Sequence, residues 1–63
     1  MFFLQIFSSE GKKVFETTDK NNCWNGTNMN TGEPCKKGLY TYKLLYELNT
    51  GFKKKESRWL TLL

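Results

Sequence analysis

The segment CWNGTNMNTGEPCKKGLY, Cys23–Tyr40, separates two stretches of β-forming sequence and decides how the chain folds. It contains both cysteines, one of the two tryptophans, the only proline and three of the five glycines. Glycine and proline shape turns in the backbone, whereas tryptophan and cysteine are residues that anchor small cores. We therefore expect this segment to be a pinned crossover between an N-terminal and a C-terminal pair of strands.

The sequence on either side of this segment is typical of β-strands. Phe2–Ser8 is dense in β-forming residues, and after a turn at Gly11 the alternating stretch Lys13–Thr17 predicts a hairpin with it. Leu39–Leu48 alternates with a period of two, which places Tyr40, Tyr42, Leu44, Tyr46 and Leu48 on one face. A turn at 49–51 then returns the chain through 52–63. These patterns predict an all-β domain of four or five strands without a helix.

The length and composition exclude several classes of site. A chain of 63 residues forms one domain, here residues 1–63, and buries only about 60% of its unfolded surface. Because the chain has no histidine and only two cysteines, it lacks the ligands of a zinc site, and no motif indicates a cofactor. No apolar stretch predicts membrane insertion, and 1–7 lacks the features of a signal peptide.

No catalytic site is predicted. The carboxylates are scattered among turns and exposed strand faces, without a nucleophile beside a base, at Glu10, Glu16, Asp19, Glu33, Glu47 and Glu56. In contrast, Trp24 precedes Asn25 and Gly26, a pair that favours a tight turn, so we expect its indole to be buried under that turn. The residues that we assign as structural anchors are Trp24, Asn25, Gly26, Gly38, Tyr40 and Tyr42.

The two cysteines bracket the turn-rich loop. If the loop doubles back, the Cα atoms of Cys23 and Cys35 could approach to the ~5.5 Å that a disulfide needs. Closing this loop would stabilise the domain by roughly 3 kcal/mol on the chain-entropy model. The alternative is a pair of reduced, half-buried thiols, as in a cytosolic protein.

The net charge of +4 includes two basic clusters. These lysines are candidates for contact with nucleic acid or another polyanion, because small β-modules combine basic grooves with aromatic side chains. The alternative is a solvated, charged strand edge that prevents aggregation, and nucleic acid is the less favoured partner. The lysines concerned are Lys36, Lys37, Lys53, Lys54 and Lys55.

Four motifs occur in an order that resembles a known family. They are Ile6–Thr17, with the pattern IFxxxGxxVFET, then WNGT at Trp24–Thr27, then GxPCxxGLYxY at Gly32–Tyr42, and LTLL at Leu60–Leu63. This order resembles the gliding motility-associated C-terminal domain, the type B sorting domain of the Bacteroidetes type IX secretion system. The resemblance covers nearly the whole chain.

The resemblance implies a small immunoglobulin-like antiparallel β-sandwich. It implies a non-catalytic C-terminal module that directs a passenger protein across the outer membrane to the cell surface or the medium, with the secretion machinery as partner. Such an oxidising location favours the disulfide between Cys23 and Cys35.

Two departures from the family pattern carry further expectations. The family usually begins upstream with a Pro-Asn-Gly-Asp-Gly type segment, so the resemblance implies that 1–63 is the C-terminal portion of the domain, without its first strand. The exposed strand edge that results predicts a homo-oligomer, with Phe2–Leu4 covering the gap in a neighbouring copy. Ser8–Glu10 also replaces a family Asn-Arg-Trp, and we expect Trp59 to fill part of the volume of the missing tryptophan.

Overall fold

The computed structural model describes residues 1–63 and consists of strands joined by turns and one long loop. The strands are β1 (Phe2–Phe7), β2 (Lys13–Thr17), β3 (Gly38–Glu47) and β4 (Lys53–Leu62). The all-β class predicted from the sequence is therefore confirmed. The chain forms no helix with the length and apolar character needed to span a bilayer.

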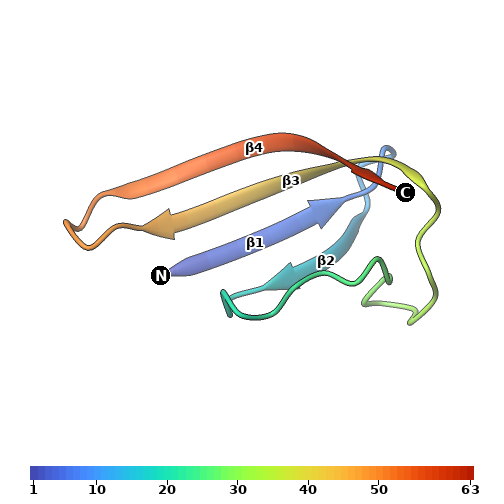
Figure 1. The fold of residues 1–63 in the computed structure, drawn as a ribbon, viewed down its shortest axis with the longest axis horizontal. Coiled ribbons are helices and arrows are strands. Elements are labelled where there is room, and N and C mark those ends of the chain that lie inside the picture. Colours follow the sequence, from blue (N-terminus) through green and yellow to red (C-terminus); the bar gives the residue numbers. More distant parts are fainter.

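The strands form one open antiparallel sheet in the order β2-β1-β3-β4 (Figure 1). Both predicted hairpins, β1–β2 and β3–β4, are present, and β1 lies between β2 and β3. Because β1 is paired on both sides within the chain, it is not an edge strand, and the predicted cover of a neighbouring copy by Phe2–Leu4 stays a prediction. The edges of the sheet are β2 and β4.

The register divides the side chains between two faces. β1 and β3 place Leu4, Ile6, Tyr40 and Tyr42 on one face of the sheet. We call this the covered face, because the long loop, residues 18–37, packs on it. The opposite side is the open face, and it carries Phe3, Phe7, Leu39, Leu45 and Trp59. A period of two along each strand separates these sets. In β1 only Ile6 is buried, and the other residues on both faces are half-buried.

The core lies on the covered face, at one end of the sheet. Its buried members are Ile6, Val14, Phe15 and Tyr40. Val14 is an extra residue in β2, because Phe15 pairs with Ile6 while Lys13 pairs with Phe7. A bulge of this kind bends its strand and changes the direction of its side chains.

The long loop closes one side of the molecule. It runs beside β2 before it crosses to the start of β3 (Figure 1). The backbone N–H of Met29 donates to the carbonyl of Val14 at 2.9 Å, and the Asn30 side chain donates to the carbonyl of Lys13 at 3.0 Å. The loop therefore supplies partners to the outer edge of β2.

The domain is less compact than most chains of its length. It exposes 4962 Å², whereas a compact monomer of this mass exposes about 4,200 Å². Its dimensions of 38 × 19 × 18 Å describe an elongated molecule. A single open sheet with a loop over one face is consistent with a small immunoglobulin-like sandwich, in which the loop takes the place of part of the second layer.

Candidate recognition surface

The turn at Trp24–Thr27 is closed by side-chain hydrogen bonds. The indole Nε1–H of Trp24 donates to the carbonyl of Thr27 at 3.0 Å, and the Asn25 side chain accepts from the N–H of Thr27 at 3.1 Å. The half-buried indole meets the ring of Tyr40 edge-on, with ring centroids 5.3 Å apart. Loop and sheet are thus joined by an aromatic pair that a polar turn holds in place.

Gly26 has the backbone conformation that this turn requires. Its φ is +83°, a region that residues with a Cβ rarely adopt. A Cβ at this position would lie 3.4 Å from Cδ1 of Leu62 in β4. The carbonyl of Gly26 also accepts from the N–H of Cys35 at 2.7 Å, next to the bridge between Thr27 and Pro34. The two arms of the loop are therefore held together over the end of the sheet.

Tyr40 joins the core to the loop. Its ring is buried, and its hydroxyl donates to the carbonyl of Lys36 at 2.6 Å. Burial raises the pKa of this phenol, and the nearby thiol of Cys35 raises it further. Tyr42 is half-buried on the same face, and Gly38 begins the strand with a φ of +142°. The structure thus places Trp24, Asn25, Gly26 and Tyr40 close together.

The cysteines are free thiols in the structure, Cys23 exposed and Cys35 half-buried against the core. In the short ladder of the loop, Gly26 lies opposite Cys35. Cys23 comes three positions earlier, outside this ladder. The disulfide stays a prediction.

The two lysine clusters lie far apart. Lys36 and Lys37 precede β3, whereas Lys53–Lys55 begin β4 beside the other end of β3. Since β3 has 10 residues at ~3.3 Å each, about 30 Å separates the clusters. The structure therefore does not bring these lysines together as one basic patch.

The loop leaves the open face uncovered. At one end Phe7, Leu39 and Trp59 form an apolar group, in which Trp59 is 68% exposed. Trp59 is therefore not part of the core, and the expectation that it fills part of the volume of the missing tryptophan stays a prediction. Lys43 lies over the Phe7 ring, with its Nζ 5.6 Å from the ring centroid. The alternation of each strand places these residues on one face, but the sequence did not show that this face would stay uncovered.

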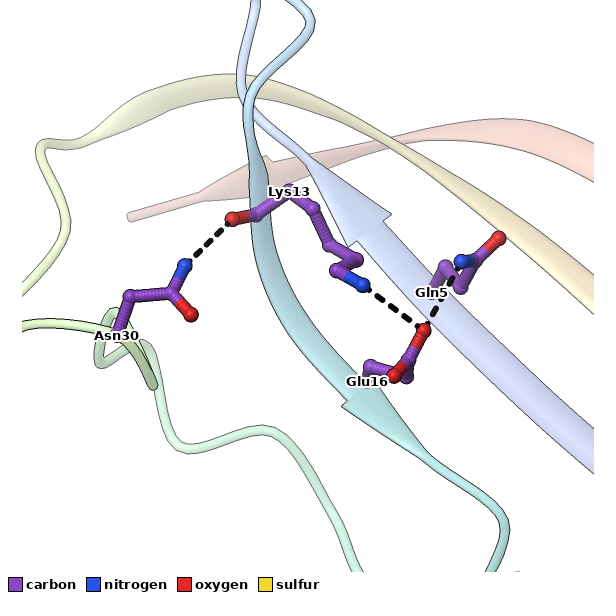
Figure 2. A network of polar contacts seen from close by, with 4 residues as sticks. All are labelled: Gln5, Lys13, Glu16 and Asn30. Atoms are coloured by element: carbon purple, nitrogen blue, oxygen red, sulfur yellow. Dashed lines mark hydrogen bonds and ion pairs between the residues drawn. The ribbon is translucent and has the colours of Figure 1, made fainter.

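A row of polar side chains lies across the middle of the open face and ends at Lys13 and Glu16 on β2. The carboxylate of Glu16 accepts from the Lys13 ammonium and from the Gln5 amide, both at 3.0 Å (Figure 2). These two hydrogen bonds lower the pKa of Glu16, against a smaller opposing effect of burial. Figure 2 also shows Asn30 bound to the carbonyl of Lys13, so the row ends where the loop meets β2.

The open face has the side chains of a recognition surface. No group of three or more His, Cys, Asp or Glu side chains comes together as a metal site would require. An uncovered sheet face with aromatic, aliphatic and lysine side chains can instead bind another protein surface.

Comparison with known families agrees with this description. A family model described as the CHU_C type IX secretion signal domain matches residues 2–62, nearly the whole chain. Searches of curated proteins and of solved structures find no significant match. The chain belongs to the CHU_C type IX secretion signal domain family.

Proposed function

We propose that residues 1–63 act as a non-catalytic C-terminal sorting module that carries a passenger protein across the outer membrane to the cell surface or the medium. The family match over residues 2–62 carries this proposal. In this proposal the domain is the C-terminal portion of the family domain, and the secretion machinery binds it as a folded sheet.

The open face is the surface that we assign to this recognition. It presents Trp59 and Leu39, which are 68% and 48% exposed, beside Lys43 and Lys55. Large side chains that remain accessible on a regular sheet supply apolar contact area without a conformational change in the domain. No observation supports the polyanion alternative, because about 30 Å separates the two lysine clusters.

The test is a fusion experiment. Residues 1–63 are placed after a reporter that carries its own inner-membrane export signal, in a gliding bacterium with an intact type IX system and in a matched strain without it. We expect the reporter outside the cell only when both the domain and the system are present. Retention of the reporter in the intact strain, with the domain correctly folded, would overturn the proposed function.

A matched pair of variants tests the assigned face. Trp59→Glu places a charge on the open face, whereas Phe52→Glu makes the same change of class in the β3–β4 turn, where Phe52 is 71% exposed. We expect Trp59→Glu to reduce secretion of the fusion at least tenfold and Phe52→Glu to leave it unchanged, with circular dichroism showing that both fold. Equal secretion of the two variants would place recognition elsewhere.

A further inference from the structure

β4 has an unpaired edge, and the register shows which residues form it. The ladder with β3 begins where the N–H of Leu48 donates to the carbonyl of Phe52 at 2.8 Å, and it continues without a shift to the pair Gly38–Leu62. In an antiparallel pair, hydrogen-bonded and non-hydrogen-bonded positions alternate. The even-numbered residues of β4 therefore bond to β3, and the odd-numbered ones direct their N–H and C=O groups outward. These are Lys53, Lys55, Ser57, Trp59 and Thr61.

The other side of β3 supports this alternation. The N–H of Glu47 donates to the carbonyl of Met1 at 3.0 Å, so the odd-numbered residues of β3 bond to β1. The even-numbered residues of β3 therefore form their backbone hydrogen bonds with β4, in agreement with the pairing in the hairpin. In contrast to β4, β2 has its outward carbonyls of Lys13 and Val14 bonded to the loop. The two edges of the sheet are therefore not equivalent.

We propose that β4 pairs antiparallel with β4 of a second copy, with Ser57 opposite Ser57 on the two-fold axis. In this register Glu56 lies opposite Arg58 of the second copy, and Lys55 lies opposite Trp59 of the second copy. Symmetry repeats each pair, which gives two ion pairs and two contacts between a lysine and an indole face. All the outward backbone groups of β4 then have partners, and the sheet continues across both copies.

The charged side chains of β4 favour this register over the other registers that a two-fold axis allows. Moving the two-fold axis from Ser57 to Glu56 places Glu56 opposite Glu56 and Lys54 opposite Arg58. Moving it to Arg58 places Arg58 opposite Arg58. Like charges that face each other across a sheet are destabilising. Larger shifts shorten the ladder, so the self-complementary order of charges in β4 fits one arrangement.

The side chains that would form these pairs are available in the single chain. Arg58 is exposed and belongs to neither of the two ion pairs within the chain. The side chain of Glu56 accepts one hydrogen bond, a long one of 3.5 Å from the hydroxyl of Tyr46, and forms no ion pair within the chain. Trp59 is 68% exposed. Pairing therefore replaces no strong contact.

Exchange of the two charges tests both the interface and its register. Sedimentation equilibrium of the chain from about 10 µM to about 1 mM is expected to show a dimer, at the weak end of interfaces because an edge buries little area. Arg58→Glu and Glu56→Arg should each weaken the dimer about tenfold, since each replaces two attractive pairs by repulsive ones. The double variant restores the attraction, so its dissociation constant should return to within about threefold of the parent.

Two controls keep the test decisive. Lys37→Glu changes the net charge as Arg58→Glu does but lies in the loop, and it should leave the dimer unchanged. Ser57→Pro removes an outward N–H without touching the bonds to β3, and it should abolish the dimer while circular dichroism stays that of a folded sheet. A parent chain that remains monomeric at about 1 mM, or a double variant no better than the single ones, overturns the proposal.

Discussion

At the scale of single residues, the loop depends on the position of Gly26. A left-handed residue between Trp24 and Thr27 lets the indole donate to the carbonyl of Thr27 while its ring contacts Tyr40. The sequence predicted this turn from Asn25 and Gly26, because both residues tolerate positive φ. It contained no sign that Gly26 would lie against Leu62.

Substitution of Gly26 separates backbone strain from packing. Gly26→Ala should lower the free energy of unfolding by about 1–2 kcal/mol, the cost of left-handed backbone for alanine. The added methyl group would meet Cδ1 of Leu62 at 3.4 Å, an ordinary contact distance, so packing should add little to this cost. Gly32→Ala is the matched control, because Gly32 has a φ of +77° with no atom within 4 Å of an added Cβ. Urea denaturation of both variants measures the difference. If Gly26→Ala costs much more than Gly32→Ala, the contact with Leu62 is a constraint.

The carboxylate of Glu16 makes stability depend on pH. Its folded pKa is held below the usual 4.5 by hydrogen bonds from Lys13 and Gln5, so it adds stability that is fully present above about pH 4.5. This contribution is lost as the pH falls through the folded pKa, because the unfolded chain then binds the proton more tightly. We expect Glu16→Gln to flatten the fall in the urea midpoint between about pH 5 and pH 2. An unchanged slope would assign the acid sensitivity to other carboxylates.

At the scale of elements, β4 is a single long strand. The sequence predicted that the chain returns through 52–63 after the turn at 49–51, and Lys53–Leu62 forms one strand of 10 residues. Its long ladder with β3 overrides the weak β-preference of the three lysines. The alternation of β4 was readable in advance, but which of its edges would be free depends on the order of all the strands.

Amide hydrogen exchange can detect the two edges of β4 directly. At concentrations below those that favour pairing, the amides of Lys55, Ser57 and Trp59 should exchange at least tenfold faster than those of Glu56 and Arg58, since only the latter donate to β3. Two-dimensional NMR resolves the residues individually. Uniform protection along β4 would contradict the alternation, and loss of the difference at high concentration would be the sign of pairing.

At the scale of the whole molecule, stability is limited by the small core. Only 5 of the 63 residues are buried, and a single open sheet leaves much apolar area in water. Domains of this length commonly need a covalent or oligomeric support. The two candidates for such a support are the predicted disulfide between Cys23 and Cys35 and the proposed pairing of β4.

The predicted disulfide can be tested by mass before and after reduction. Oxidation should join Cys23 to Cys35, lower the mass by two hydrogen atoms and stabilise the fold by roughly 3 kcal/mol on the chain-entropy model. Any strain in the bridged loop reduces this gain. Two free thiols after oxidation would refute the bridge.

The sequence by itself determined the all-β class, the two hairpins and the two faces of the strand over Leu39–Leu48. These features follow from local alternation and turn chemistry, which act over a few residues, and the order of the motifs was enough to indicate the family. Only the tertiary structure decided that β1 lies inside the sheet, that the open face with Trp59 is uncovered and that β4 has a free edge. The physical reason is that exposure depends on what packs from distant parts of the chain, so alternation predicts which residues share a face but not which face remains in water.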